Sequence, residues 1–221
     1  MIIVGICGGS GSGSGKSTFA ERIRDGLSCS CEIMRLDCYY FDQGGKPFEE
    51  RTKVNYDSPE IFDFDEMLAD IRLLIDGKPV TRKGYNYAEH RRDDSEELMY
   101  PPEVLIIEGI HVFYDDRICD IMNLKLFIKV DSDICLLRRI ARDMNERGRS
   151  LESISEQYKA TVKPMREKYI DKYIDKADVV VMRGGMNEQA LKTTISYLKS
   201  CVKEQRPAES EKNESDGNDS E

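Results

Sequence analysis

The sequence lacks the residue patterns that several classes of protein require. Histidine occurs only at His90 and His111, and the seven cysteines are scattered without a C-x-x-C pair or a Cys/His cluster. This distribution argues against a zinc site or a disulfide framework and predicts reduced thiols in a cytoplasmic protein. No apolar run approaches the roughly 18 residues of a membrane span, and no basic segment precedes the first apolar run. We therefore expect neither a secreted nor a membrane protein.

A strongly basic surface is also missing. The chain carries 33 Lys and Arg against 42 Asp and Glu, for a formal net charge of −9. A protein that binds duplex nucleic acid would usually show a basic face, so we expect no nucleic-acid partner. The last fifteen residues, PAESEKNESDGNDSE, hold six acids and no apolar side chain larger than alanine. Because this composition cannot offset its ordering entropy, we predict a disordered acidic tail over residues 205–221.

What remains, residues 1–204, has the length of one domain and alternates apolar runs with helical patterns. The predicted strands are Ile2–Cys7, Glu32–Leu36, Val104–Glu108, Leu124–Val130 and Ala177–Met182. The predicted helices are Lys16–Leu27, Asp63–Ile75, Ile134–Arg147, Leu151–Tyr169 and Glu188–Lys203. This alternation is typical of a three-layer α/β fold with a central, mostly parallel sheet flanked by helices. Residues 78–92, rich in Tyr and Arg, break the rhythm and predict a small β-hairpin flap.

A loop rich in glycine and serine follows the first predicted strand and opens the first predicted helix. Small residues let backbone N–H groups close around phosphate, the helix N-terminus adds positive potential, Lys16 reaches the outer phosphates, and Ser17 can hold Mg²⁺. The strict G-x-x-x-x-G-K-[ST] pattern fails by one residue, because Ser10 stands where its first glycine belongs, and the loop is two residues longer than GGSGSGKS. A flexible Gly/Ser turn is the alternative. The predicted ATP-binding residues are Gly11, Ser12, Gly13, Ser14, Gly15, Lys16, Ser17 and Thr18.

Two carboxylates follow or end predicted strands. Asp37 comes directly after the second strand, and Glu108 ends the run VLIIE. Ligands of open α/β sheets bind beyond the carboxyl ends of the strands, so both acids are expected near Lys16. One can hold Mg²⁺ and the other can accept the proton of an attacking hydroxyl. The alternative is that each merely caps the turn that follows it.

From Ile2 to about Lys203 the sequence resembles the uridine kinase (uridine–cytidine kinase) family of P-loop kinases. The resemblance rests on ordered matches that include GKST, DCYY at 37–40, NYDSP at 55–59, YNYAEH at 85–90, IEGI at 107–110, RRIARD at 138–143, ERGR at 146–149, QY at 157–158 and VKP at 162–164. The chain departs from the family pattern at the longer phosphate loop, at Ser58, where His is common, and at Tyr87, where Phe is common.

The resemblance implies the P-loop NTPase fold and a helical lid at about residues 138–158. It implies transfer of the ATP γ-phosphate to the 5′-hydroxyl of uridine or cytidine in pyrimidine salvage, and a homotetramer. Asp37 would be the general base, Lys16, Arg142 and Arg147 would act on the phosphates, and Mg²⁺ would lie among Ser17, Asp37 and Glu108. The residues implied for the pyrimidine nucleoside are Tyr40, Asp57, Tyr85, Tyr87, His90, Arg139, Arg149 and Gln157.

Plainer explanations exist for some of these residues. A tyrosine-rich hairpin is often a packing element, a charge-rich amphipathic helix accounts for the arginines from Arg138 to Arg149, and His90 has the sequence context of an exposed turn. Two other functions also stay open. One is a kinase for another small acceptor, as in the phosphoribulokinase and pantothenate kinase groups. The other is a non-catalytic nucleotide-binding regulator.

Overall fold

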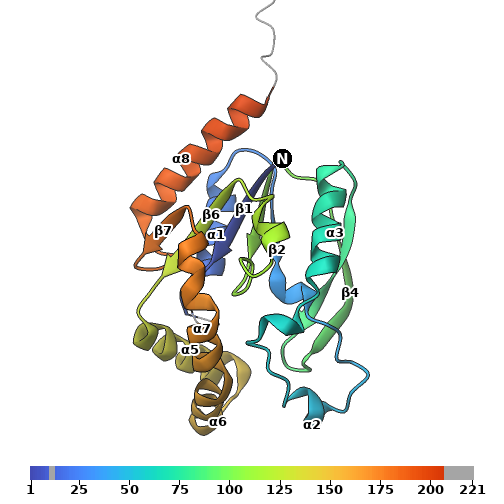
Figure 1. Cartoon of the computed structure of the whole chain (residues 1–221), viewed down its shortest axis with the longest axis vertical. Coiled ribbons are helices and arrows are strands. Elements are labelled where there is room, and N and C mark those ends of the chain that lie inside the picture. Colours follow the sequence, from blue (N-terminus) through green and yellow to red (C-terminus); the bar gives the residue numbers. More distant parts are fainter. Residues whose placement is uncertain (10–12, 207–221) are drawn as a thin grey trace, which may run out of the picture.

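Five strands form a parallel sheet at the centre of the molecule, in the order β2-β5-β1-β6-β7 (Figure 1). The structure is a computed structural model, and it describes residues 1–9 and 13–206. The strands are β1 (Ile2–Cys7), β2 (Cys31–Arg35), β5 (Val104–Glu108), β6 (Leu124–Lys129) and β7 (Val179–Met182). Every residue of β1 and β5 is buried, as expected for apolar runs covered on both faces. The predicted α/β fold with a central parallel sheet is confirmed.

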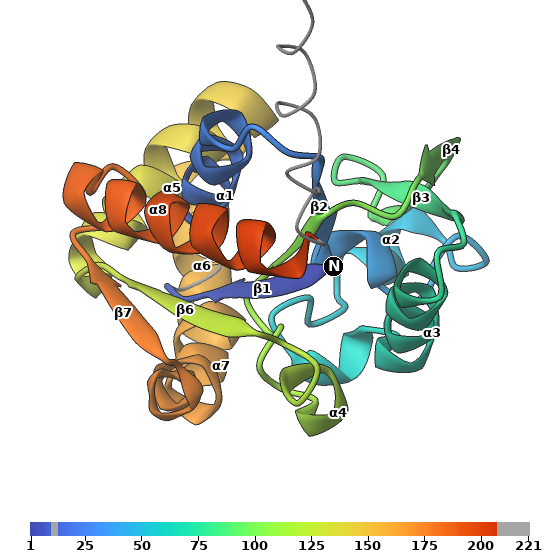
Figure 2. The same ribbon diagram turned by 90° about the horizontal axis from the view of Figure 1, so that it is seen from above.

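Helices cover both faces of this sheet (Figure 2). On one face lie α1 (Lys16–Gly26) and α8 (Glu188–Gln205), which bury Phe19, Ile23 and Leu198 against β1, β5 and β6. The opposite face packs against α3 (Phe64–Ile75), α4 (Asp116–Cys119) and the 3₁₀ segment η4 (Ile170–Lys176), whose Tyr173 is 5% exposed. The helices α1, α3 and α8 each bury a mostly apolar stripe at helical spacing, which is the pattern typical of a helix packed on a sheet.

The strand order brings three chain segments to one edge of the sheet. β5 lies between β1 and β2, and Glu108 at its end pairs in register with Ile6 of β1 and Arg35 of β2. The phosphate loop follows β1, and the 3₁₀ turn η1 (Leu36–Tyr39) with Asp37 follows β2. Segments that are separated by about thirty and seventy residues in the chain therefore meet at the carboxyl edge.

Two further substructures stand beside that edge (Figure 1). One is the helical arm of α5 (Ser132–Arg147), α6 (Leu151–Gln157), a π-helical turn η3 (Tyr158–Val162) and α7 (Lys163–Lys168). The other comprises the antiparallel hairpin β3 (Val80–Asn86) and β4 (Arg91–Met99), together with α2 (Phe48–Arg51) and the 3₁₀ turn η2 (Pro59–Ile61).

Several boundaries differ from those predicted by one or two residues, and three differences bear on the substructures beside the sheet and on the tail. The hairpin is longer than residues 78–92, because β4 continues to Met99; this strand is charged along most of its length and carries no apolar alternation. The predicted helix Leu151–Tyr169 is interrupted by the π turn. The helix α8 extends to Gln205, so one residue of the predicted tail is helical, and residues 207–221 lie outside the described residues. In the part of the chain that is described, no helix combines the length and apolarity needed to cross a bilayer.

Candidate active site

The loop between β1 and α1 brings a buried lysine to a helix N-terminus. Gly15 precedes α1 with a φ of 82°, a left-handed conformation that favours glycine, and a Cβ there would lie 2.8 Å from the amide nitrogen of Gly185. Lys16 is 5% exposed. Among residues 1–9 and 13–206, no carboxylate lies within ion-pair distance of its ammonium group. A buried cation beside the N–H groups at the start of a helix is suited to binding phosphate.

The ends of the phosphate loop are held by two contacts. The Ser14 hydroxyl donates to the carbonyl oxygen of Gly8 at 3.3 Å, and Arg138 of α5 donates to the carbonyl oxygen of Gly13 at 2.8 Å. These contacts tie the loop to itself and to the helical arm. Two of the predicted ATP-binding residues, Gly11 and Ser12, lie outside the described residues. Thr18 is in the first turn of α1, and its side chain is exposed.

Glu108 and Ser17 form the part of the site that fits a divalent cation. The Ser17 hydroxyl donates to Glu108 Oε2 at 3.1 Å, and Glu108 is 6% exposed. Burial raises the pKa of the Glu108 carboxyl, while Lys16 lowers it and Asp37 raises it. Mg²⁺ prefers such hard oxygen ligands and usually takes one or two from protein and the rest from phosphate and water. No described residues form a cluster of three or more His, Cys, Asp or Glu able to hold a metal alone.

Asp37 is held by the tip of the hairpin. The Tyr87 hydroxyl donates to Asp37 Oδ2 at 2.5 Å, and the Arg147 guanidinium lies 4.8 Å from the centre of the Tyr87 ring. Desolvation of the Tyr87 hydroxyl, and next the neighbouring Asp37 charge, raise the pKa of Tyr87. The three side chains come from η1, from the turn after β3 and from the end of α5. A carboxylate, an aromatic wall and a cation thus meet over the carboxyl edge of the sheet.

An aromatic cluster lines the space beside Asp37. Tyr40 is 6% exposed, stacks on Phe62 with ring centroids 4.3 Å apart, and donates its hydroxyl to the Tyr56 carbonyl oxygen at 3.3 Å. Tyr85 lies 4.7 Å from the Tyr40 ring and 5.2 Å from the Tyr87 ring. The register of β3 and β4 shifts between Lys83 and this tyrosine, which sets the tip of the hairpin apart from its base. The cluster offers flat apolar surfaces of the kind that hold a heterocyclic ring.

His90 stands at one side of this cluster. Its imidazole stacks on the Tyr56 ring at a centroid distance of 5.1 Å and an interplanar angle of 22°. Its φ of 50° is unusual for a residue other than glycine and marks a conformation maintained by surrounding contacts. Burial lowers the pKa of His90, and Arg149, Arg51 and Arg147 lower it further. The imidazole is therefore neutral at pH 7, with one nitrogen able to donate and the other able to accept a hydrogen bond.

Asp57 and three residues of the helical arm, Arg139, Arg149 and Gln157, form the side of the site that faces the aromatic cluster. Arg139 and Arg149 both donate to the side-chain oxygen of Gln157, at 3.0 and 2.6 Å. Asp57 is 7% exposed, and burial raises its pKa while the charge of Arg139 lowers it. A carboxylate near two guanidinium groups can accept hydrogen bonds from vicinal hydroxyls, which is the chemistry that a sugar presents.

The arginines of the arm share one acidic partner. Asp143 of α5 is fully buried and forms ion pairs with Arg139, Arg142, Arg147 and Arg149. Removing this carboxylate would leave four guanidinium groups close together without their common counter-charge. Asp143 therefore holds together Arg142 and Arg147, predicted to act on phosphate, and Arg139 and Arg149, predicted to bind the nucleoside.

Three residues near the site escaped the sequence predictions. Asp143 has a signal that could have found it, since it lies four residues from both Arg139 and Arg147 on one helix. The other two are His111 and Thr161, which contact Asp57 across 54 and 104 residues of chain. No local pattern in the sequence marks such contacts.

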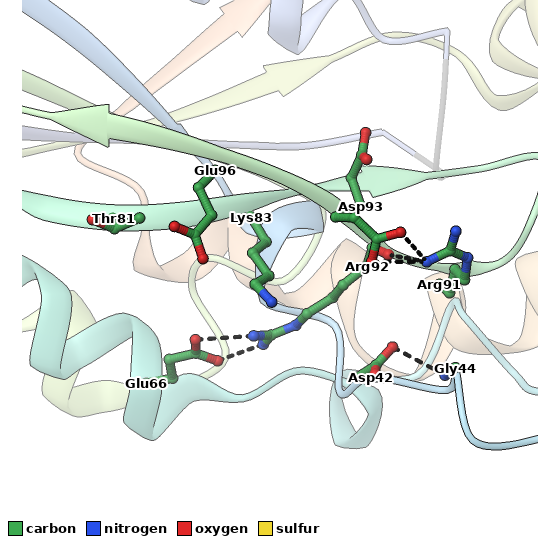
Figure 3. A pocket seen from close by; sticks show the side chains of 10 residues that line it. Asp42, Gly44, Glu66, Thr81, Lys83, Arg91, Arg92, Asp93 and Glu96 are labelled. Atoms are coloured by element: carbon green, nitrogen blue, oxygen red, sulfur yellow. Dashed lines mark hydrogen bonds and ion pairs between the residues drawn. The ribbon is translucent and has the colours of Figure 1, made fainter.

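A concave surface lies on the hairpin and shares no residue with the predicted site (Figure 3). Its volume is about 440 Å³, and it is lined by residues of β3, β4, α3 and the loop at Asp42–Gly44. Arg92 pairs with Glu66 and Arg91 pairs with Asp94, so much of its charge is internally matched. We therefore place the candidate active site at the carboxyl edge of the sheet.

The chain is similar to known kinases in sequence and in fold. The Phosphoribulokinase / Uridine kinase family matches residues 3–190. The chain is 41% identical over 203 residues to the uridine kinase of Ligilactobacillus salivarius, covering 91% of this chain and 94% of that protein. It is 42% identical over 204 residues to the uridine kinase of Streptococcus pyogenes, covering 92% and 97%. The phosphoribulokinase of Rhodobacter spheroides has the same fold, with a TM-score of 0.62 at 14% identity over 82% of this chain and 69% of that one.

Proposed function

The chain belongs to the Phosphoribulokinase / Uridine kinase family, and on that premise we propose that it transfers the γ-phosphate of ATP to the 5′-hydroxyl of uridine or cytidine. The products would be UMP or CMP, which is a step of pyrimidine salvage. The observation that carries the proposal is the meeting of Lys16, Glu108 and Asp37 at one edge of the sheet, beside the aromatic cluster of Tyr40, Tyr85 and Tyr87. Phosphoryl transfer needs positioning and charge neutralisation, and this arrangement offers both.

Each residue has a defined part in the proposed reaction. Lys16 and the N–H groups at the start of α1 bind the outer phosphates, and Arg142 and Arg147 approach them from the helical arm. Ser17, Glu108 and Asp37 supply oxygen ligands for Mg²⁺, which when bound neutralises charge on the phosphates. Asp37 accepts the proton of the 5′-hydroxyl as that oxygen attacks the γ-phosphorus.

The nucleoside is held by the two walls of the pocket. The base lies against Tyr85 and Tyr87, and the neutral imidazole of His90 pairs with its polar edge. Because neutral imidazole has both a donor and an acceptor, it suits the carbonyl of uracil and the amino group of cytosine alike. Asp57 and Arg139 bind the sugar hydroxyls, with Gln157 and Arg149 completing that side.

The test is release of ADP from ATP and Mg²⁺ with a panel of acceptors. The panel comprises uridine, cytidine, adenosine, guanosine, ribulose 5-phosphate and pantothenate, with ATP alone as the control. We expect turnover with the two pyrimidine nucleosides and little with the rest. Equal turnover with purine nucleosides would contradict the base pocket, and turnover with ribulose 5-phosphate or pantothenate would assign another acceptor. ATP binding without turnover on any acceptor would favour a regulator.

A further inference from the structure

The helical arm contains a local irregularity whose cause is in the sequence. Pro164 stands in the first turn of α7 and has no N–H to donate to the preceding helical turn. Just before it, η3 is a π turn, in which the Lys163 N–H donates to the carbonyl oxygen of Tyr158, five residues back. Such a turn holds one residue more than an α-helical turn and rotates the side chains beyond it. Single π turns are frequent at functional sites.

This turn carries Thr161, whose hydroxyl reaches across to the candidate sugar site. Thr161 Oγ1 lies 2.9 Å from Asp57 Oδ2 and 3.2 Å from the carbonyl oxygen of Gln157. The residue is partly buried, and Val162 beside it is 2% exposed, which anchors the turn in the core. The contact joins the arm to a loop that is 104 residues away in sequence.

The Asp57 loop is rigid on its other side. The carbonyl oxygen of Asp57 accepts a hydrogen bond from His111 Nε2 at 2.8 Å, and the Tyr173 hydroxyl donates to His111 Nδ1 at 2.9 Å. His111 is fully buried. The backbone of Asp57 is thereby fixed, and the remaining freedom of its carboxylate is rotation about its side-chain bonds.

Of the two oxygens of the Asp57 carboxylate, only Oδ2 has a hydrogen-bond donor among the residues that the structure describes. No described residue donates a hydrogen bond to Asp57 Oδ1, while Thr161 donates to Oδ2. The charged groups that act on Asp57 are Arg139 of α5, Arg149 after α5 and Asp37 of η1. Because two positive charges and one negative charge act on it, the Asp57 carboxylate can rotate among several orientations unless a hydrogen-bond donor selects one.

We propose that Thr161 is a positioning residue for sugar recognition: its hydroxyl fixes the rotation of the Asp57 carboxylate and leaves Oδ1 for the sugar hydroxyls. This inference rests on the proposed function, because it assigns the free oxygen to a nucleoside. Thr161 touches neither phosphate nor the attacking hydroxyl in this scheme. Its loss should therefore appear in the KM for the nucleoside rather than in kcat.

The hydroxyl also favours the ionised carboxylate. Burial raises the pKa of Asp57, while Arg139, the Thr161 hydroxyl and Arg149 lower it and Asp37 raises it. Without the hydroxyl this pKa rises further, so Asp57 becomes protonated at a higher pH than in the wild type. The rise of the uridine KM at low pH should then begin at a higher pH in the variant than in the wild type.

The experiment compares Thr161→Val, which keeps the shape and removes the hydroxyl, with Thr161→Ser, which keeps the hydroxyl. The matched control is Thr194→Val. Thr194 is buried in α8, and its hydroxyl donates to the carbonyl oxygen of Ala190, four residues earlier, at 2.8 Å. Thr161 makes the same kind of backbone contact, but Thr194 does not contact Asp57. Steady-state rates are measured with uridine, with 2′-deoxyuridine and with varied ATP.

We expect Thr161→Val to raise the uridine KM about tenfold, the effect of one hydrogen bond to a charged group. In Thr161→Val we also expect kcat and the ATP KM to stay within about twofold of the wild type, and the preference for uridine over 2′-deoxyuridine to shrink. Thr161→Ser and Thr194→Val should behave like the wild type. An unchanged uridine KM, an equal rise for both nucleosides, or failure of serine to restore affinity would overturn the inference while leaving the kinase activity intact. A wild type that phosphorylates no nucleoside would overturn the proposed function and this inference with it.

Discussion

Replacing Asp37 by Asn tests the assignment of the proton acceptor. The change keeps the size of the side chain and removes its charge and basicity. The amide oxygen can still accept the Tyr87 hydroxyl, which donates to Asp37 Oδ2 at 2.5 Å. Asp37 is half-buried in the short turn η1 after β2, so the substitution creates no cavity. We therefore expect a folded protein that binds uridine and ATP nearly as well as the wild type.

Turnover should fall much further than binding. General acid–base catalysis contributes typically two to four decades of rate, which corresponds to about 3–5 kcal/mol of barrier. The loss of one negative charge reduces repulsion of the phosphates, but it also weakens one of the three proposed Mg²⁺ ligands, so its two effects on ATP affinity oppose each other. The expected result is a kcat lowered by roughly a hundredfold to ten-thousandfold with little change in ATP affinity.

The matched control is Asp93→Asn in the hairpin. Asp93 accepts a hydrogen bond from the Ser95 amide, which an asparagine oxygen can also accept, and it lies outside the candidate site. Calorimetry measures the two affinities, and ADP release measures turnover. A kcat for Asp37→Asn within a few-fold of the control would remove Asp37 from the role of general base. A loss of both affinities would instead indicate a structural role.

Two further predictions concern the buried histidine and the phosphate loop. Burial lowers the pKa of His111 to about 4. The stabilisation that comes from burying the neutral imidazole is therefore complete above pH 6.5 and is lost as the pH falls toward 4. The free energy of unfolding lost in this way is about 3 kcal/mol. Urea unfolding between pH 7 and pH 4 should therefore show a stability difference between wild type and His111→Gln that shrinks with acidification, and a constant difference would contradict the assignment. Gly15→Ala should weaken ATP binding roughly tenfold or more, because its Cβ would meet the Gly185 backbone and the φ of 82° is strained for alanine. Calorimetry with ATP compares it with Gly45→Ala, whose Cβ meets nothing within 4 Å, and equal affinities would show that the loop does not need this conformation.

The sequence by itself determined the sheet, the long helices and the phosphate loop. β1 and β5 have the predicted bounds, because an unbroken apolar run is stable only when both of its faces are covered. The motif GKST between a strand and a helix predicted the position of Lys16, because this signal also lies within a few neighbouring residues. The prediction that Asp37 and Glu108 lie near Lys16 came from the general rule that ligands bind at the carboxyl ends of parallel strands.

The tertiary structure alone decided which side chains meet around those acids. Tyr87 came to Asp37 over 50 residues of chain, and Thr161 came to Asp57 over 104 residues. The continuation of β4 beyond residue 92 also escaped prediction, since its charged residues are held by pairing with β3 and not by an apolar pattern of their own. Local propensity and periodicity are properties of neighbouring residues, whereas these contacts depend on how separate elements pack, and packing is a property of the whole chain.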